Sequence, residues 1–157
     1  MYRLIVWYYR LFNRHLLKPV DLGDRDEYTD GEWNQLVGDT GEDLSCIWLW
    51  NHGRKVLYRQ YTAKGGGEVD IIFREGEILV FCEVKTRTSK DFGNPAKAVN
   101  REKQRLITKG ANAWIRELGF LPAVFRFDII EVILIEGELP ELNHIENAFN
   151  AAPRLLA

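Results

Sequence analysis

The sequence predicts an α/β fold with the element order αβββαβ, in which helices flank a mixed sheet. Four short runs rich in β-branched and aromatic residues predict strands near residues 56–61, 68–73, 78–85 and 124–132. Apolar residues at helical spacing predict one helix before the first strand and a longer one between the third and fourth. With 157 residues, 46% of them hydrophobic, the chain can bury a core of this size.

The first predicted helix runs from about residue 40 to residue 51. Thr40 is a suitable N-cap, and His52-Gly53 is a suitable end. Glu42, Cys46 and Leu49 share one face of this helix, so Glu42 can point with apolar neighbours towards the sheet. The alternative is an exposed first-turn Glu that the helix dipole stabilises.

Three ionisable residues lie inside otherwise hydrophobic strand sequences: Asp70, Glu83 and Lys85. Alternation along a strand places Glu83 and Lys85 on one face. A hairpin turn at residues 74–77 can bring Asp70 beside them. Two neighbouring carboxylates repel each other unless a cation compensates, and carboxylate oxygens suit Mg²⁺. The alternative is an ordinary ion pair between Glu83 and Lys85 on a solvated sheet face.

The longer helix is predicted to begin near Pro95 and to end at Gly119, with one largely apolar face. Its basic residues recur at successive i+4 positions, and this stripe can follow a phosphate backbone: Lys97, Arg101, Arg105 and Lys109. A solvated helix face is the alternative.

Charge is distributed unevenly, although the whole chain carries only −2. Residues 21–43 contain nine acids and one base, whereas residues 85–109 contain eight bases and two acids. The basic block follows Glu83-Val84-Lys85 directly, which favours a nucleic-acid partner.

The motifs also have a characteristic order. They are Gly41-Glu42, Gly67-Glu68-Val69-Asp70, the run Glu83 to Arg87, Phe92-Gly93-Asn94-Pro95, Ala98-Val99 and Lys103. Together they resemble the YraN-like family of the PD-(D/E)XK nuclease superfamily, which is similar in fold to archaeal Holliday-junction resolvases. One departure is Gln60-Tyr61-Thr62, where the family usually has an Asn-x-Arg stretch. This stretch therefore lacks the Arg that the resemblance would place at a phosphate contact.

The resemblance implies a restriction-endonuclease-like fold and metal-dependent endonuclease hydrolysis of DNA phosphodiester bonds, in repair or recombination. It implies that Asp70 and Glu83 bind Mg²⁺ or Mn²⁺ directly, and that Glu42 assists through water or a second ion. Lys85 would orient the nucleophile, and Glu68 would support the ligands. The expected nucleic-acid contacts are Arg87, Lys97, Arg101, Lys103, Arg105 and Lys109. The resolvase likeness further implies a homodimer and branched DNA.

A function of a different class fits the same residues. A non-catalytic nucleic-acid-binding module could keep the nuclease-like fold and act through a partner. Such a module would bind DNA without metal, and its basic helix would contribute more than its carboxylates.

The cysteines and histidines indicate neither a disulfide nor a zinc site. Cys46 and Cys82 lie in apolar contexts, and the sequence shows no secretory signal, which predicts reduced core thiols in a cytoplasmic protein. His15, His52 and His144 lack the spacing of zinc ligands.

The chain is predicted to have three parts: an amphipathic segment and acidic linker at 1–37, the endonuclease-like domain at 38–135, and a tail at 136–157. Met1 to Lys18 carries four bases and no acids, and it is too interrupted to cross a bilayer. We expect it to pack against protein rather than contact a membrane surface. A structural protein that docks through this segment is a third alternative.

Overall fold

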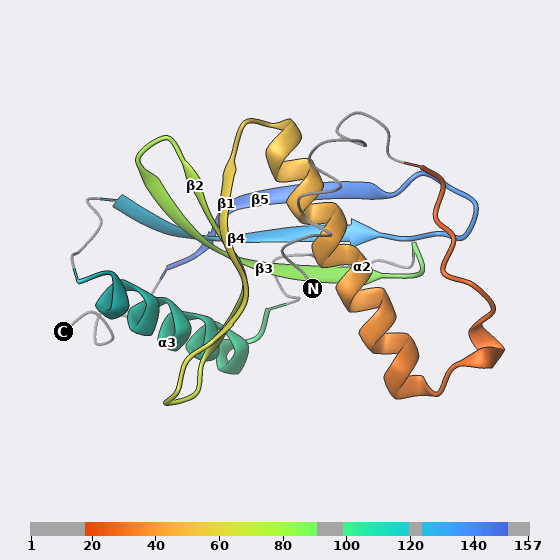
Figure 1. Ribbon diagram of the computed structural model, residues 1–157, viewed down its shortest axis with the longest axis horizontal. Coiled ribbons are helices and arrows are strands. Elements are labelled where there is room, and N and C mark those ends of the chain that lie inside the picture. Colours follow the sequence, from red (N-terminus) through yellow and green to blue (C-terminus); the bar gives the residue numbers. More distant parts are fainter. Residues whose placement is uncertain (1–17, 91–98, 120–123, 151–157) are drawn as a thin grey trace.

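A five-stranded sheet with helices on both faces forms the protein (Figure 1). The computed structural model describes residues 18–90, 99–119 and 124–150. The helical elements are η1 (Arg25–Glu27), α2 (Asp30–Asn51) and α3 (Arg101–Leu118). The strands are β1 (Lys55–Thr62), β2 (Glu68–Glu75), β3 (Ile78–Arg87), β4 (Val124–Ile133) and β5 (Glu141–Phe149). The sheet order is β1-β2-β3-β4-β5; β3 and β4 are parallel, and the other neighbours are antiparallel. The predicted α/β fold class is confirmed.

Two hydrophobic cores lie on opposite faces of the sheet, one under each helix. Strand alternation divides β3 between them. Val80, Cys82 and Val84 belong to the core that contains Cys46 and Leu49 of α2. The other core brings together Leu79 and Phe81 of β3 with the buried face of α3, namely Ile107, Ala111 and Ile115. Both cysteines are buried and free, as predicted.

The first helix, α2, begins well before the predicted start at Thr40. Its N-cap is Thr29, which forms a capping box with Glu32. Thr40 lies inside the helix, where its Oγ1 donates to the Leu36 carbonyl oxygen at 2.7 Å. The sequence predicts an acidic linker here, whereas Trp33 and Val37, one helical turn apart, lie on the face of α2 that packs against the core. The predicted domain boundary at residue 38 consequently falls within α2.

The predicted C-terminal tail at 136–157 is wrong for Glu141–Phe149, which forms β5 and pairs antiparallel with β4. This strand lies at the edge of the sheet and alternates polar residues with half-buried ones. Edge strands of this kind carry a weak hydrophobic pattern. The acidic linker also contacts this end of the chain, because Val20 forms a β-bridge with Glu136.

Helix α3 begins later than Pro95 in the described residues, with Asn100 as its N-cap. It ends as predicted at Gly119, which adopts the left-handed conformation. The predicted apolar face is correct for Ile107, Ala111 and Ile115, but Leu106 and Leu118 are exposed. Pro95 and Lys97 lie outside the described residues.

The turn between β1 and β2 lies directly beside α3 (Figure 1). Gly67 has a φ of +104°, and a Cβ there would lie 2.6 Å from the Gly110 backbone nitrogen. Gly110 in turn leaves room for Glu68 and Val69. The two glycines therefore allow the helix to approach the start of β2 at backbone distance.

Replacing Gly67 with Ala should destabilise the protein by roughly 2 to 4 kcal/mol, because the new Cβ combines a strained φ with a clash against α3. Urea denaturation measures the change. Gly65→Ala is the matched control, since a Cβ at Gly65 meets no atom within 4 Å. Equal stability of the two variants would show that this close approach is not required.

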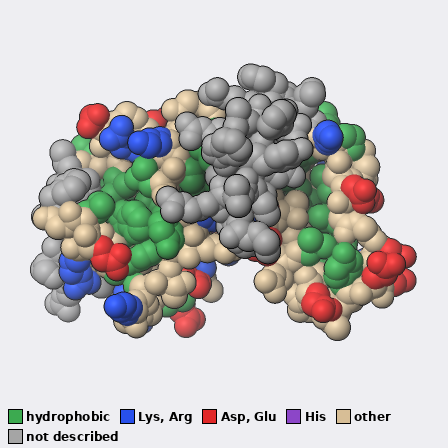
Figure 2. Space-filling view, viewed as in Figure 1, with side chains coloured by type: hydrophobic (Ala, Val, Ile, Leu, Met, Phe, Trp, Pro, Cys, Tyr) green, Lys and Arg blue, Asp and Glu red, His purple; other side chains and the backbone are tan. Residues whose placement is uncertain are grey.

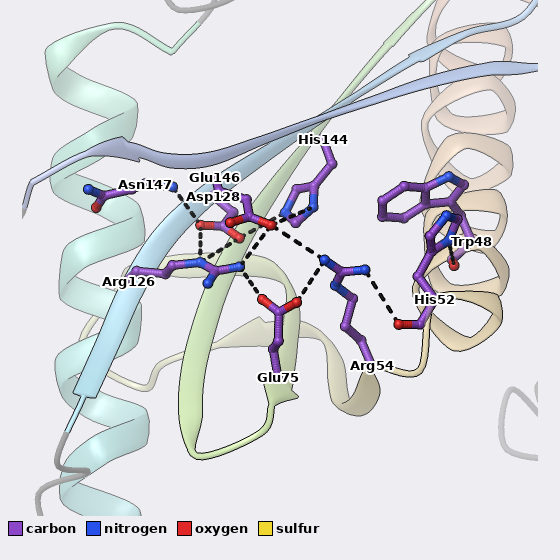
Figure 3. A network of polar contacts seen from close by, with 9 residues as sticks. All are labelled: Trp48, His52, Arg54, Glu75, Arg126, Asp128, His144, Glu146 and Asn147. Carbon is purple, nitrogen blue, oxygen red and sulfur yellow. Dashed lines mark hydrogen bonds and ion pairs between the residues drawn. The ribbon is translucent and has the colours of Figure 1, made fainter.

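A buried polar network joins β2, β4 and β5 on the α2 face of the sheet (Figure 3). Asp128 lies at its centre and accepts hydrogen bonds from Arg126 Nε at 2.9 and 3.0 Å. His144 Nε2 lies 2.8 Å from the same carboxylate. Arg126 also pairs with Glu75, which pairs with Arg54. The network ties the β2–β3 hairpin to the edge strand.

None of the helices within residues 18–90, 99–119 and 124–150 combines the length and apolarity that a membrane span requires. The predicted amphipathic segment, apart from Lys18, lies outside these ranges.

Candidate active site

Strands β2 and β3 separate at the position of Asp70. Their backbone pairing ends at Ile71 and Cys82. Beyond that point β2 continues to pair with β1, and β3 continues to pair with β4. The Asp70 carboxylate accepts a hydrogen bond from the Val84 backbone N–H at 2.8 Å. This contact fixes the Asp70 side chain where the two strands separate. We call this place, with Asp70, Glu83 and Lys85, the fork.

Glu83 and Lys85 form an ion pair on β3, with Lys85 Nζ 2.7 Å from Glu83 Oε1. The Glu83 side chain is only 1% exposed, whereas Lys85 is 32% exposed. The predicted shared face is therefore confirmed, but the alternative of an ion pair on a solvated face is wrong for Glu83. Burying a carboxylate is costly unless charge partners surround it.

A second ammonium reaches Glu83 from α3. Lys103 Nζ lies 3.3 Å from Glu83 Oε2 and 2.6 Å from Glu68 Oε1. Glu83 Oε2 is buried and has no hydrogen bond within the described part of the chain. The sequence placed Lys103 among the nucleic-acid contacts, whereas the structure places its ammonium between two carboxylates of the candidate site.

The environment of Asp70 favours its protonated form. Burial, followed by repulsion from Glu83, raises its pKa to about 8, against the opposing effects of the Val84 N–H and Lys103. Glu42 adds a smaller repulsion. The three predicted carboxylates therefore interact electrostatically, and the fork concentrates negative charge.

Glu42 stands where α2 packs closely on β3. A Cβ at the preceding Gly41 would collide with the Thr86 side chain, so glycine is needed for this approach. Burial raises the pKa of Glu42, and a hydrogen bond from Arg59 opposes the increase. Arg59 Nε donates to Glu42 Oε2 at 3.0 Å, and Arg59 also pairs with Asp43.

Arg59 is a site neighbour that the sequence did not indicate. Arg59 lies on β1, and its contacts with α2 depend on how the helix crosses that strand. The position of Arg59 in the sequence does not indicate these contacts. In residues 18–90, 99–119 and 124–150, no three His, Cys, Asp or Glu residues are grouped to hold a metal. Glu42 is held by Arg59 rather than joined to Asp70 and Glu83, and its role as a ligand stays a prediction.

Glu131 is a further buried acid beside the fork. It is the neighbour of Lys85 in the parallel pairing of β3 with β4. Its Oε1 lies 3.6 Å from Arg87 Nε, and both atoms are buried without a hydrogen bond to any described residue. The signal that singled out Glu83, an acid within an apolar strand, also marks Glu131 in the sequence.

Comparison with known proteins settles the family. The model of "Uncharacterised protein family UPF0102" matches residues 41–132. The chain belongs to this family. A UPF0102 protein of Geobacter metallireducens is 44% identical over 119 residues, which cover 76% of this chain and 96% of the relative. One from Rhodococcus jostii is 39% identical over 116 residues, covering 74% and 98%. The predicted YraN-like membership is confirmed.

The UPF0102 match contains every residue of the fork. It begins at Gly41, includes Asp70, Glu83 and Lys85, and ends just after Glu131. In the structure, three of the four predicted catalytic side chains lie together, namely Asp70, Glu83 and Lys85. The fourth, Glu42, lies close enough to influence the pKa of Asp70.

The predicted basic stripe is partly visible in the structure. Arg101, Arg105 and Lys109 are exposed on α3, while Lys97 lies outside the described residues. Lys109 donates to the Gly65 carbonyl oxygen. Acidic side chains gather instead at the end of the molecule formed by η1 and the start of α2 (Figure 2). The charge asymmetry predicted from the sequence thus has a spatial counterpart.

Proposed function

We propose that this UPF0102 protein is a metal-dependent endonuclease that hydrolyses phosphodiester bonds of DNA. The observation that carries the proposal is the fork, where Asp70 and the Glu83–Lys85 pair lie together. A structural ion pair needs only one carboxylate. Two carboxylates that converge in a largely buried position are typical of a site that binds a cation for hydrolysis. We further propose that it acts in the cytoplasm as a homodimer, with branched DNA among its substrates.

The residues of the fork fit a divalent cation. Glu83 Oε2 is buried without a hydrogen bond, and the pKa of Asp70 is raised by burial and by repulsion from Glu83. A cation would relieve both conditions, and carboxylate oxygens suit Mg²⁺ or Mn²⁺. Asp70 and Glu83 would hold it, with Glu42 in a supporting position. When bound, such an ion supplies Lewis-acid stabilisation of charge on a phosphate.

The side chains around the carboxylates have distinct roles in this proposal. Lys85 is partly exposed beside Glu83, so its ammonium can meet the nucleophile or a phosphate oxygen. Arg87, held near Glu131, extends the positive edge of β3. Arg101 and Arg105 on α3 are exposed and can contact the DNA backbone away from the scissile bond.

Cleavage assays with Lys85→Ala test the proposal. Purified wild-type protein is incubated with linear, single-stranded and branched DNA in Mg²⁺ or Mn²⁺. We expect Lys85→Ala to reduce cleavage by about 10²- to 10³-fold, because it removes one group that stabilises developing charge. Lys55→Ala is the matched control. Lys55 is exposed and pairs with Arg74, at the end of β2 that lies away from Asp70.

The outcomes separate two classes of function. Full-rate cleavage by Lys85→Ala would contradict the proposed role of this lysine. If wild-type protein binds DNA without cleaving any substrate, the non-catalytic binding module becomes the better account. In that case, charge reversal at Arg101 and Arg105 should weaken binding, while Asp70→Asn and Glu83→Gln should not.

A further inference from the structure

Lys103 is held in a position that the proposed phosphodiester chemistry does not explain. Its ammonium lies between Glu68 and Glu83, at 2.6 and 3.3 Å. It belongs to α3, the helix that also carries the exposed Arg101 and Arg105. A lysine whose only task was to contact DNA would extend into solvent, as a flexible and strongly hydrated cation usually does.

The carboxylates explain why Lys103 points inwards. Glu83 is buried, and Lys85 Nζ lies 2.7 Å from its Oε1. Glu83 Oε2 has no hydrogen bond within the described residues, and the Lys103 ammonium lies 3.3 Å from it and compensates its charge. Although burial alone would lower the pKa of Lys103, its bond to Glu68 and the charges of Glu83 and Asp70 raise it. The lysine is therefore a charged counter-ion at this site.

The position of the helix makes this contact specific. The Gly67–Gly110 approach fixes α3 at backbone distance from the start of β2. Lys103 lies two helical turns before Gly110, on the side of α3 that meets Glu68. The contact thus depends on the packing of α3 and not on the flexible side chain alone.

We propose that Lys103 and a divalent cation compete for Glu83, so that cation binding releases the Lys103 ammonium to contact a substrate phosphate. This inference rests on the proposed function, because it assumes that the fork binds a cation. In the metal-free protein Lys103 stabilises Glu83 and Glu68. With the cation present, Lys103 keeps only its ion pair with Glu68, whose side chain is 49% exposed, and this solvated pair can exchange for a phosphate of DNA bound along α3. Cation binding and DNA binding would then be coupled through a single residue.

Calorimetric titration of full-length protein with Ca²⁺ and Mn²⁺, without DNA, tests the competition. Lys103→Met should bind the cation about tenfold more tightly than wild type, because one competing positive charge is removed. Lys103→Arg keeps the charge and should remain much closer to wild type. Lys55→Met, which removes an exposed charge elsewhere, should leave the affinity unchanged.

DNA binding provides the second measurement. In wild type, Ca²⁺ should strengthen binding to a phosphodiester duplex, and Lys103→Met should lose a several-fold part of that increase. Tighter cation binding together with a smaller Ca²⁺ effect supports the proposal. If wild type binds cation but Lys103→Met leaves both quantities unchanged, the competition is wrong while the proposed nuclease stands. If wild type binds no cation, both are overturned.

Discussion

Replacing Asp70 with Asn is expected to abolish cation-dependent cleavage and, in the absence of metal, to stabilise the protein near neutral pH. Asn keeps an oxygen that can accept the Val84 N–H, but it cannot ionise. Cleavage should fall at least 10³-fold, because the change removes a charged ligand of the proposed cation. A catalytic residue that destabilises its own fold is a common result of selecting for activity.

The sign of the stability change follows from the pKa of Asp70. Burial and Glu83 raise it from 3.8 to about 8 in the folded protein. Between these values the unfolded chain binds fewer protons than the folded one, so stability falls as pH rises. The stabilising contribution is complete below pH 4 and is lost as pH rises through 8. At about 1.4 kcal/mol per pKa unit the full shift sets an upper limit of about 6 kcal/mol, and relaxation and water entry around the charged carboxylate reduce it, so we expect Asp70→Asn to gain roughly 2 to 4 kcal/mol at pH 8.

Urea denaturation in EDTA, from pH 4 to pH 9, measures this difference. The gain from Asp70→Asn should be small at pH 4 and should grow towards pH 8. Glu77→Gln is the control, because Glu77 is exposed in the turn between β2 and β3. A constant difference across this range would show that the Asp70 carboxyl does not titrate anomalously. Retained cleavage by Asp70→Asn would remove Asp70 from the catalytic site.

The residues of the fork could be predicted because their signal is local. Strand periodicity gave the faces of β2 and β3, and charges within apolar strands drew attention to Asp70 and Glu83. The same signal was available for Glu131. By contrast, the inward position of Lys103 depends on the close approach of Gly67 and Gly110, which are distant in the sequence. No helical pattern in α3 alone could show which lysine meets Glu83.

The fold was predicted least well at the acidic start of α2 and at the edge strand β5. The acidic start of α2 is stabilised by the Thr29–Glu32 capping box and by burial of Val37. The edge strand β5 has a weak apolar pattern, because four of its nine residues are exposed and the other five are only half-buried. Its identity as a strand depends on pairing with β4 and on the network around Asp128.

Asp128 is therefore expected to be a major source of stability. Its side chain is fully buried, and it accepts hydrogen bonds from Arg126, from His144 and from the Asn147 backbone N–H at 2.9 Å. Burial alone would raise its pKa, but these hydrogen bonds lower it. Its contribution is thus present above the pKa of an unfolded Asp and is lost as pH falls.

Asp128→Asn should destabilise the protein by roughly 3 to 5 kcal/mol at pH 7, because Arg126 loses its fully buried charge partner and keeps only the more exposed Glu75 and Glu146. The new amide also places a donor where the carboxylate accepted hydrogen bonds. Urea denaturation measures the loss, again with Glu77→Gln as the exposed control.

A double variant distinguishes a specific network from general damage to the core. Arg126→Met combined with Asp128→Asn should lose less stability than the sum of the single changes, because each single change leaves one member of the buried Arg126–Asp128 pair without the other. Strict additivity would show that the two residues act independently. Loss of the Asp128 network should affect folding on the α2 face, whereas loss of Asp70 should affect cleavage in the fork. The two variants therefore separate the residues that hold β5 in the sheet from those proposed to act on DNA.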